Sequence, residues 1–456
     1  MSSEIPSIGS RLRKDARELA RLAWPVILSR SGVMLMALVD TIMVGQYASR
    51  ELAYLSMGLA PFGPMLVAGV GVCMGTQVVT AMTYGEGRYR DVGAVWRRGA
   101  PFAFCIGLIG TLACLFGETG LLATGQTPEL AAGGGEILLI LGLGLPFVLF
   151  YIATSFFLEG INRPLPGLYF MMIANVLNVF LNWALIYGNA GFPEMGAAGS
   201  AWTTTILRIL LAICAAAYVW TLRDHEDLGI RRKLEGTWSS WQRQRRIGYA
   251  SSWSIGGESI GFGITGIMIG NLGPLALGAH AILFNMIVFT AMIAIGVSTA
   301  TSIRVGHARG AKQYSASRLA TVTGLAFASL AIGVIAASFV AFNDAYAAMY
   351  TADEQLARFV APMIAFIAAI VLVDANRVVM NSSLRGRGET WVPAVLNTTA
   401  YLVIMVPLAW LLGLQFGFGL DGVYTAVLIA GIMSFALLGI RFIWLSKRDP
   451  ADGDGR

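Results

Sequence analysis

Long apolar runs recur along this chain of 456 residues, and they limit its possible folds more than any other feature. A bilayer core about 30 Å thick is crossed by about 20 apolar residues in a helix. The runs cover residues 22–46, 52–80, 99–117, 136–158, 167–188, 197–221, 248–270, 276–303, 319–343, 359–382, 392–413 and 422–444. They do not alternate apolar with polar residues, as the strands of a closed barrel do. The sequence therefore predicts an all-α integral membrane protein with twelve transmembrane helices.

The composition agrees with a membrane protein. Hydrophobic residues make up 56% of the chain and charged residues 13%, whereas soluble proteins carry about 25% charged residues. The net charge of +6 comes from basic clusters between the apolar runs, which indicates membrane topology rather than nucleic-acid binding. We expect the lipid bilayer as partner and no nucleic acid.

The basic residues also predict an orientation. If the N-terminus is cytoplasmic, nearly all lysines and arginines outside the spans fall on the cytoplasmic side, and the outer loops hold only Arg50 and Arg358. An extra or missing span would destroy this pattern. By the positive-inside rule we expect a multi-pass membrane protein with both termini in the cytoplasm. We expect its location to be a bacterial-type inner membrane.

The chain repeats itself at the half. A polar segment, 222–247, separates a lobe at 22–221 from a lobe at 248–445, and cytoplasmic segments at 1–21 and 446–456 flank the two. A constant shift of 225 residues, which we call the repeat shift, aligns glycines, a threonine and a tyrosine of the two lobes. The aligned pairs are Gly45 with Gly270, Gly71 with Gly296, Thr76 with Thr301, Gly85 with Gly310 and Tyr89 with Tyr314. Such a parallel repeat predicts two pseudo-symmetric six-helix lobes with a substrate cavity between them.

Ionisable residues inside the spans are the main functional signal. A charge at the bilayer centre costs at least about 2.5 kcal/mol, so each of these side chains must pair, protonate or face a cavity. Because burial favours the neutral form of a carboxylate, an acidic side chain there can load a proton or a cation and release it when water returns. The six that lie well inside the spans are Arg30, Asp40, Arg208, Glu258, Asp374 and Arg377.

Asp40 belongs to the first span, and polar side chains of two other spans are candidate partners. Asn175, Asn178 and Asn182 lie on one face of the fifth span, and Thr204 lies in the sixth. These side chains form either an oxygen-rich cage for a hard cation or an inert hydrogen-bond network, and the residues alone leave both readings open.

The C-terminal lobe carries a second acidic group. Glu258 has no charged partner nearby in the sequence, which favours a functional role for it. Asp374 and Arg377 are three residues apart on one helix face, so the alternative for them is mutual neutralisation.

Four segments resemble signatures of the MATE (multidrug and toxic compound extrusion) transporter family. Together they extend the resemblance over nearly the whole chain. They are WPVILSRSGVMLMALVDTIMVGQYASRELAYLS from Trp24, NVFLNWALIYG from Asn178, GAAGSAWTT from Gly196 and SLRGRGET from Ser383.

The resemblance implies an antiporter that exports bulky cationic or aromatic drugs and toxic metabolites in exchange for sodium or protons. Two lobes would alternate between outward and inward openings. It also implies cation or proton sites at family positions, with sodium possible at each acidic residue. These are Asp40, Asn178, Asn182 and Thr204 in the N-terminal lobe, and Glu258 and Asp374, the pair of the NorM-like branch, in the C-terminal lobe.

Two departures from the NorM-like pattern concern the C-terminal pair. Ile370 stands where relatives can carry a tyrosine, and Arg377 follows Asp374 by one turn, where it would compete with a bound cation. We expect Arg377, Phe284, Asn285 and Phe289 among the residues that line the substrate cavity.

A lipid-linked oligosaccharide or lipid flippase of the same superfamily is the alternative function. An enzyme is not expected, because the spans hold no metal-ligand spacing and no nucleophile-and-base pair. The four cysteines lie singly in apolar runs and suit buried packing. We expect no cofactor apart from the coupling ion, and a monomer.

Overall fold

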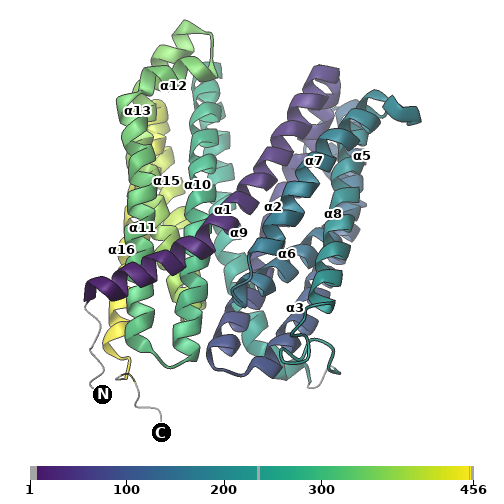
Figure 1. Ribbon diagram of the computed structural model, residues 1–456. Coiled ribbons are helices and arrows are strands. Elements are labelled where there is room, and N and C mark those ends of the chain that lie inside the picture. Colours follow the sequence, from purple (N-terminus) through teal and green to yellow (C-terminus); the bar gives the residue numbers. More distant parts are fainter. Residues whose placement is uncertain (1–7, 234–236, 451, 453–456) are drawn as a thin grey trace, which may run out of the picture. The chain divides into compact units, whose positions relative to one another are not determined.

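The computed structural model describes residues 8–233, 237–450 and 452, and throughout this part the regular structure is helical (Figure 1). The first half contains α1 Ile8–Tyr47, α2 Ser49–Gly85, α3 Tyr89–Cys114, α4 Gly117–Ala123, α5 Pro128–Leu143, α6 Leu145–Gly160, α7 Leu165–Tyr187 and α8 Gly196–Trp220. The second contains α9 Gln242–Gly270, α10 Pro274–Gly310, α11 Tyr314–Ala341, α12 Asn343–Tyr350, α13 Glu354–Gly386, α14 Trp391–Thr398, α15 Met405–Ala409 and α16 Gly419–Lys447. The predicted all-α membrane fold is confirmed.

Within the described part of the chain, ten helices are long and apolar enough to cross a membrane, and the bent pair α5–α6 makes eleven. The seventh predicted span, 248–270, coincides with α9, which is not among them. At 29 residues and 1.5 Å per residue α9 is about 44 Å long, so its length suffices. It falls short in hydropathy, because arginines occupy its first turns and serines, glycines and Glu258 its middle.

The fourth predicted span, 136–158, is broken in the structure. The axes of α5 and α6 meet at 42° across Gly144. Pro146 stands in the first turn of α6, where it has no backbone N–H to donate to α5. Gly107 of α3 lets that proline approach, since a Cβ on Gly107 would lie 2.3 Å from the Pro146 Cα. A proline and two glycines therefore set the bend.

The chain divides into two compact units, and the division falls inside helices. One unit contains Leu28–Ser252, and the other contains Met1–Ile27 together with Trp253–Arg456. Helices α1 and α9 thus each contribute to both units. Ile27 and Ser252, the residues just before the two breaks, are themselves related by the repeat shift. The lobes expected at 22–221 and 248–445 began where apolar runs begin, so their edges differ from those of the units.

The repeat also appears in the packing of each unit by itself. A Cβ on Gly71 of α2 would lie 2.4 Å from the Ser252 Cα, and a Cβ on Gly296 of α10 would lie 3.0 Å from the Ile27 Cα. The repeat shift relates both partners of the first contact to those of the second. It also relates the contact of Gly99 with Thr76 to that of Gly324 with Thr301. At equivalent positions of the two halves, a glycine without a side chain therefore allows the same kind of close helix contact.

An aspartate that follows a long helix binds arginine in each unit, and the repeat shift relates the two aspartates. Asp224 follows α8, and Asp449 follows α16. Asp224 forms two hydrogen bonds with Arg163, at 2.9 and 2.7 Å, which raise the pKa of that arginine. Its counterpart under the repeat shift, Asp449, binds Arg387 at 2.5 Å and Arg309 at 2.7 Å. The repeat thus extends past the apolar runs into the basic loops.

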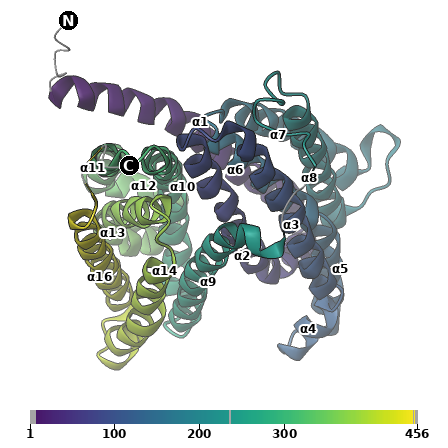
Figure 2. The ribbon, with the colours of Figure 1, turned by 90° about the horizontal axis from the view of Figure 1, so that it is seen from below.

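One helix lies at the centre of each unit. Helix α13 packs against α10, α11 and α16, and α6 packs against α2, α3 and α8 (Figure 2). Helix α7 packs on α8. These contacts bring the polar residues of α7 next to α8 and place the charged residues of α13 inside its unit.

Candidate cation sites

The first site is centred on Asp40 and lies within the unit Leu28–Ser252. Its carboxylate accepts hydrogen bonds from the side-chain amides of Asn178, at 2.9 Å, and Asn182, at 2.6 Å. The Thr204 hydroxyl donates a third at 2.9 Å. Asn178 and Asn182 are one helical turn apart on α7, and Thr204 faces them from α8, so the packing of α7 on α8 builds the site. The structure brings together all four N-terminal residues that the sequence singled out.

The amide oxygens of this site lack partners. The Oδ1 atoms of Asn178 and Asn182 are buried and accept no hydrogen bond. The amide orientation follows from chemistry, because only the NH₂ groups can donate to a carboxylate. Unpaired buried carbonyl oxygens are costly unless a ligand, an ion or water satisfies them. Asn175 does not join the group, since its amide donates to the Met171 carbonyl at 2.8 Å.

Within the described part of the chain, no cationic side chain forms an ion pair with Asp40. Among the described residues, no lysine or arginine nitrogen lies within 4.0 Å of its carboxylate. Arg208 donates to the Leu141 carbonyl at 3.3 Å and lies over the Phe62 ring, 4.7 Å from its centre. Its charge acts on Asp40 electrostatically, without a direct contact. Asp40 is half-buried, so the site combines a reachable carboxylate with buried amides.

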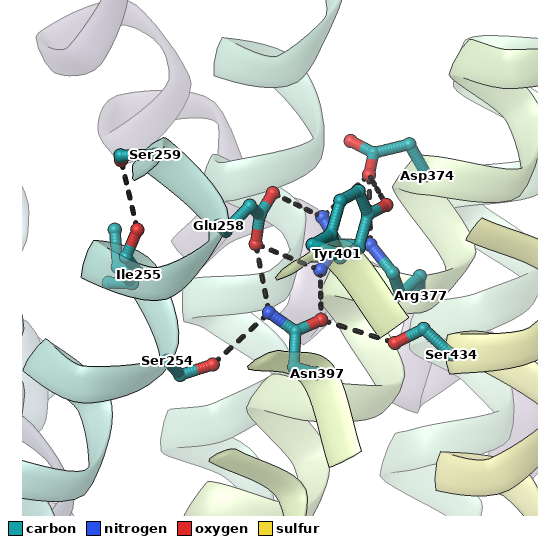
Figure 3. Close-up of polar contacts among 9 residues, drawn as sticks. All are labelled: Ser254, Ile255, Glu258, Ser259, Asp374, Arg377, Asn397, Tyr401 and Ser434. Carbon is teal, nitrogen blue, oxygen red and sulfur yellow. Dashed lines mark hydrogen bonds and ion pairs between the residues drawn. The ribbon is translucent and has the colours of Figure 1, made fainter. Parts of the chain in front are cut away.

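The second site lies within the other unit and joins both C-terminal carboxylates to one arginine (Figure 3). Arg377 binds Glu258 through Nη2 at 2.7 Å and through Nη1 at 3.1 Å. It binds Asp374 through Nη2 at 2.6 Å and through Nε at 2.9 Å. The guanidinium is 2% exposed, whereas the Glu258 and Asp374 side chains are 24% and 21% exposed.

Polar groups from three further helices complete the second site. Asn397 accepts from Arg377 Nη1 at 2.7 Å and donates to Glu258 at 3.0 Å, and Ser254 and Ser434 bond to the same amide. The Tyr401 hydroxyl lies 3.5 Å from Asp374 Oδ1. Sequence reasoning missed these four residues, because none of them carries a charge.

Tyr401 supplies the phenol that is absent at Ile370. It lies in the π-helical segment Thr399–Ile404, where an extra residue per turn changes the direction of the side chains. A π-helix has no simple sequence pattern, although Pro407 just beyond the segment signals an irregular helix.

A fourth carboxylate, Glu159, was also missed, although it is buried. It is 3% exposed and pairs with Arg30 at 3.2 Å, and it accepts a hydrogen bond from Gln77 at 2.7 Å. The predicted fourth span ended at residue 158, whereas α6 continues to Gly160. Arg30 inside the first span was the available signal, since a buried arginine requires an acidic partner.

The residues expected to line a substrate cavity are in different surroundings. Phe289 is 60% exposed and Phe284 is 39% exposed, whereas Arg377 is buried. Asn285 accepts a hydrogen bond from Tyr350 at 3.2 Å. A hollow of about 390 Å³ between α13 and α16 involves none of the four. It is lined by Arg358, Phe359, Pro362, Met363, Phe366, Asp421 and Thr425.

Comparisons with known proteins agree over almost the full length. A family model described as MatE matches residues 25–184 and 257–411. A probable multidrug resistance protein NorM of Caulobacter vibrioides is 35% identical over 439 residues, 95% of this chain and 93% of its own. The multidrug resistance protein MdtK of Yersinia enterocolitica is 25% identical over 444 residues, 96% of this chain and 97% of its own.

Solved structures show the same fold. The eukaryotic MATE transporter AtDTX14 superposes with a TM-score of 0.87 at 17% identity, covering 96% of this chain and 98% of its own. A MATE protein solved in a bent conformation superposes with a TM-score of 0.87 at 19% identity, covering 97% of this chain and 99% of its own.

Proposed function

The chain belongs to the MATE family of multidrug efflux transporters, and we propose that it works as an ion-coupled antiporter. It is a multi-pass membrane protein whose relatives are named multidrug transporters rather than enzymes. We propose that it exports bulky cationic or aromatic compounds in exchange for sodium ions or protons. We also propose a bacterial inner-membrane location with both termini in the cytoplasm.

One observation carries the proposed ion coupling: the Asp40 carboxylate has only neutral hydrogen-bond partners among the described residues and forms no ion pair there. Of the four carboxylates described above, Glu159, Glu258 and Asp374 are ion-paired with arginine, and Asp40 is not. A small cation or proton can load at Asp40 without displacing a charged side chain. The unpaired amide oxygens of Asn178 and Asn182 supply further ligands of the kind that hard cations prefer.

Loading of an ion at Asp40 changes how α1 is held. The charged carboxylate accepts three hydrogen bonds from α7 and α8. A proton or sodium ion at its oxygens weakens these bonds, because the acceptor loses negative charge. Helix α1 continues without a break from the residues of one unit into those of the other. A change at Asp40 therefore acts on the element that both units share, and it shifts the balance between two transport states.

The in-span arginines argue against the alternative of a flippase for lipid-linked oligosaccharides. An anionic pyrophosphate headgroup would require available cationic side chains. Arg30 is bound to Glu159 and Arg377 to two carboxylates, while Arg208 contacts a backbone carbonyl and an aromatic ring.

Transport in proteoliposomes tests the proposed function. Export of a fluorescent cationic dye is followed under a sodium gradient and, separately, under a pH gradient. We expect one of the gradients to drive export by the unaltered protein and neither to drive it in Asp40→Asn. Glu354→Gln serves as control, because Glu354 is exposed and pairs only with exposed Arg358. Gradient-driven export by Asp40→Asn at the normal rate would show that coupling does not use Asp40.

A further inference from the structure

The guanidinium of Arg377 is completely satisfied. An arginine has five N–H donors, and here five donor contacts occur, two to Glu258, two to Asp374 and one to Asn397. The Tyr401 ring covers one face, with the guanidinium carbon 4.7 Å from the ring centre. Figure 3 shows the arginine between the two carboxylates, at the place where a shared ligand would sit.

Most carboxylate oxygens of Glu258 and Asp374 already accept hydrogen bonds. Both Glu258 oxygens accept from Arg377, and one of them also accepts from Asn397. Asp374 Oδ1 receives Arg377 Nε, Arg377 Nη2 and the Tyr401 hydroxyl. Among the described contacts only Asp374 Oδ2 is without a partner, and a single oxygen does not form the cage that a hard cation requires.

We propose that Arg377 is a resident counter-ion, meaning a side chain that permanently takes the place of a coupling cation between Glu258 and Asp374. The C-terminal acidic pair then carries no ion through the transport cycle, and Asp40 alone couples export to the ion gradient. This inference rests on the proposed ion-coupled function and specifies where coupling occurs.

Arg377 can replace a bound cation permanently because its guanidinium is covalently attached to α13. A free ion leaves the site when water enters, whereas the guanidinium remains attached to α13 and returns to the same oxygens. A competing cation would have to break five hydrogen bonds and leave a buried arginine without partners, which is strongly unfavourable. Two carboxylates and one guanidinium leave one net negative charge, so the arginine already compensates one of the two carboxylates without an ion.

Removal of the arginine charge should open a second ion site. In Arg377→Met, two carboxylates, the Asn397 amide oxygen and the Tyr401 hydroxyl would surround the freed position. Close carboxylates cannot both remain charged without a counter-ion, so the pair would take up a sodium ion or a proton.

Binding measurements on detergent-purified full-length protein test this proposal, with ²²Na⁺ and proton uptake as the probes. All variants carry Asp40→Asn, so that the first site contributes nothing. We expect no saturable sodium binding and no extra proton uptake in Asp40→Asn alone. We expect one sodium ion or one proton per chain after addition of Arg377→Met, and loss of that uptake after further addition of Glu258→Gln.

Three controls keep the result interpretable. A normal thermal melt shows that the Arg377→Met protein is folded, and Arg377→Lys, which keeps the charge, is expected to bind no added ion. If Arg377→Met does not fold, Asp40→Asn and Asp40→Asn/Glu258→Gln are compared directly, and equal absence of binding supports the proposal. Sodium binding in Asp40→Asn that depends on Glu258 would overturn it, as would a folded Arg377→Met variant that takes up neither ion.

Failure of the proposed function gives a different result. If gradient-driven export survives in Asp40→Asn, the N-terminal coupling site is wrong. The binding comparison at Glu258 then still reports whether Arg377 excludes an ion.

Discussion

Asn182 donates the shortest hydrogen bond to Asp40, at 2.6 Å, and its removal should change ion loading in a direction that depends on the ion. Proton loading should become easier, because the charged carboxylate loses a donor that stabilises it. Sodium loading should become weaker, because the Asn182 amide oxygen is lost as a ligand. A hydrogen bond to a charged group contributes about 1.5–3 kcal/mol. In Asn182→Ala we expect the ion concentration for half-maximal dye export to change by about tenfold or more. Asn175→Ala is the matched control, because Asn175 lies on the same helix and bonds only to the Met171 carbonyl. Equal behaviour of the two variants in the proteoliposome assay would contradict the role given to Asn182.

Glu159 should matter for stability rather than for ion coupling. In Glu159→Gln the half-buried Arg30 loses its charged partner, and breaking a fully buried pair costs about 3–5 kcal/mol, which is the upper bound here. We expect a clear fall in the melting temperature in detergent, and partial recovery when Arg30→Met is added, because no charge then remains unpaired. Exposed Glu354→Gln should melt like the unaltered protein. A Glu159→Gln protein of unchanged stability but without ion-driven export would mean that Glu159 itself carries an ion.

The sequence predicted residue contacts correctly where the two partners are close together on one helix. The i, i+3 relation of Asp374 and Arg377 predicted a possible pair, and the structure contains it. The partner of Glu258 could not be predicted, because Arg377 is 119 residues away and helix packing alone brings the two together. Around Asp40, only Asn178 and Asn182 could be grouped by spacing, because they are four residues apart on one helix face, whereas Asp40 and Thr204 come from two other helices.

At the scale of elements, the close approach at Gly71 of α2 gives a sharp prediction. A Cβ there would lie 2.4 Å from the Ser252 Cα, and backbone cannot move aside as a flexible side chain can. We expect Gly71→Ala to reduce the yield of folded protein and its melting temperature, measured by fluorescence-detected gel filtration and thermal melts. Gly63→Ala on the same helix should be tolerated, since no heavy atom lies within 4 Å of the added methyl. Comparable yields from both variants would show that the contact does not limit folding.

Helix positions followed from hydrophobicity, but helix ends and breaks did not. The first predicted span began at residue 22, whereas α1 begins at Ile8, because a helix can continue as a polar segment beyond the apolar run. The run 136–158 was read as one span, and the structure bends it at Gly144. The run 392–413 contains two π-helical segments, Thr399–Ile404 and Trp410–Gln415, on either side of Pro407. Average hydrophobicity is insensitive to these local hydrogen-bond changes.

At the scale of the whole molecule, the position of the break points predicts which fragments fold. Residues 242–252 belong to the unit Leu28–Ser252, where the backbone of Gln244 and Ser252 lies against Gly75 and Gly71. A fragment of residues 28–252 should therefore be stable in detergent, and one of residues 28–236, which lacks these contacts, should not. Limited proteolysis and thermal melts of the two fragments test this. If both resist protease equally, the first turns of α9 are dispensable for that unit.

The repeat shift could be read from the sequence, but the positions at which the two units divide could not. Glycines matched at a constant spacing predicted two similar halves, and the same spacing relates Gly71 to Gly296 as packing sites. The expected edges at 22 and 248 followed apolar runs. Ile27 and Ser252, where the units divide, carry no signal of their own, because the division depends on contacts made across the sequence.

The division of α1 and α9 also has a consequence for the origin of the protein. A single half of this chain lacks the turns that the other half supplies to it, so a half-length ancestor of this design would have been unfinished as a monomer. Two copies that traded the beginnings of their first helices would have completed each other, as in domain swapping. Gene fusion would then have joined an obligate pair, and present-day α9 would preserve the start of the second copy.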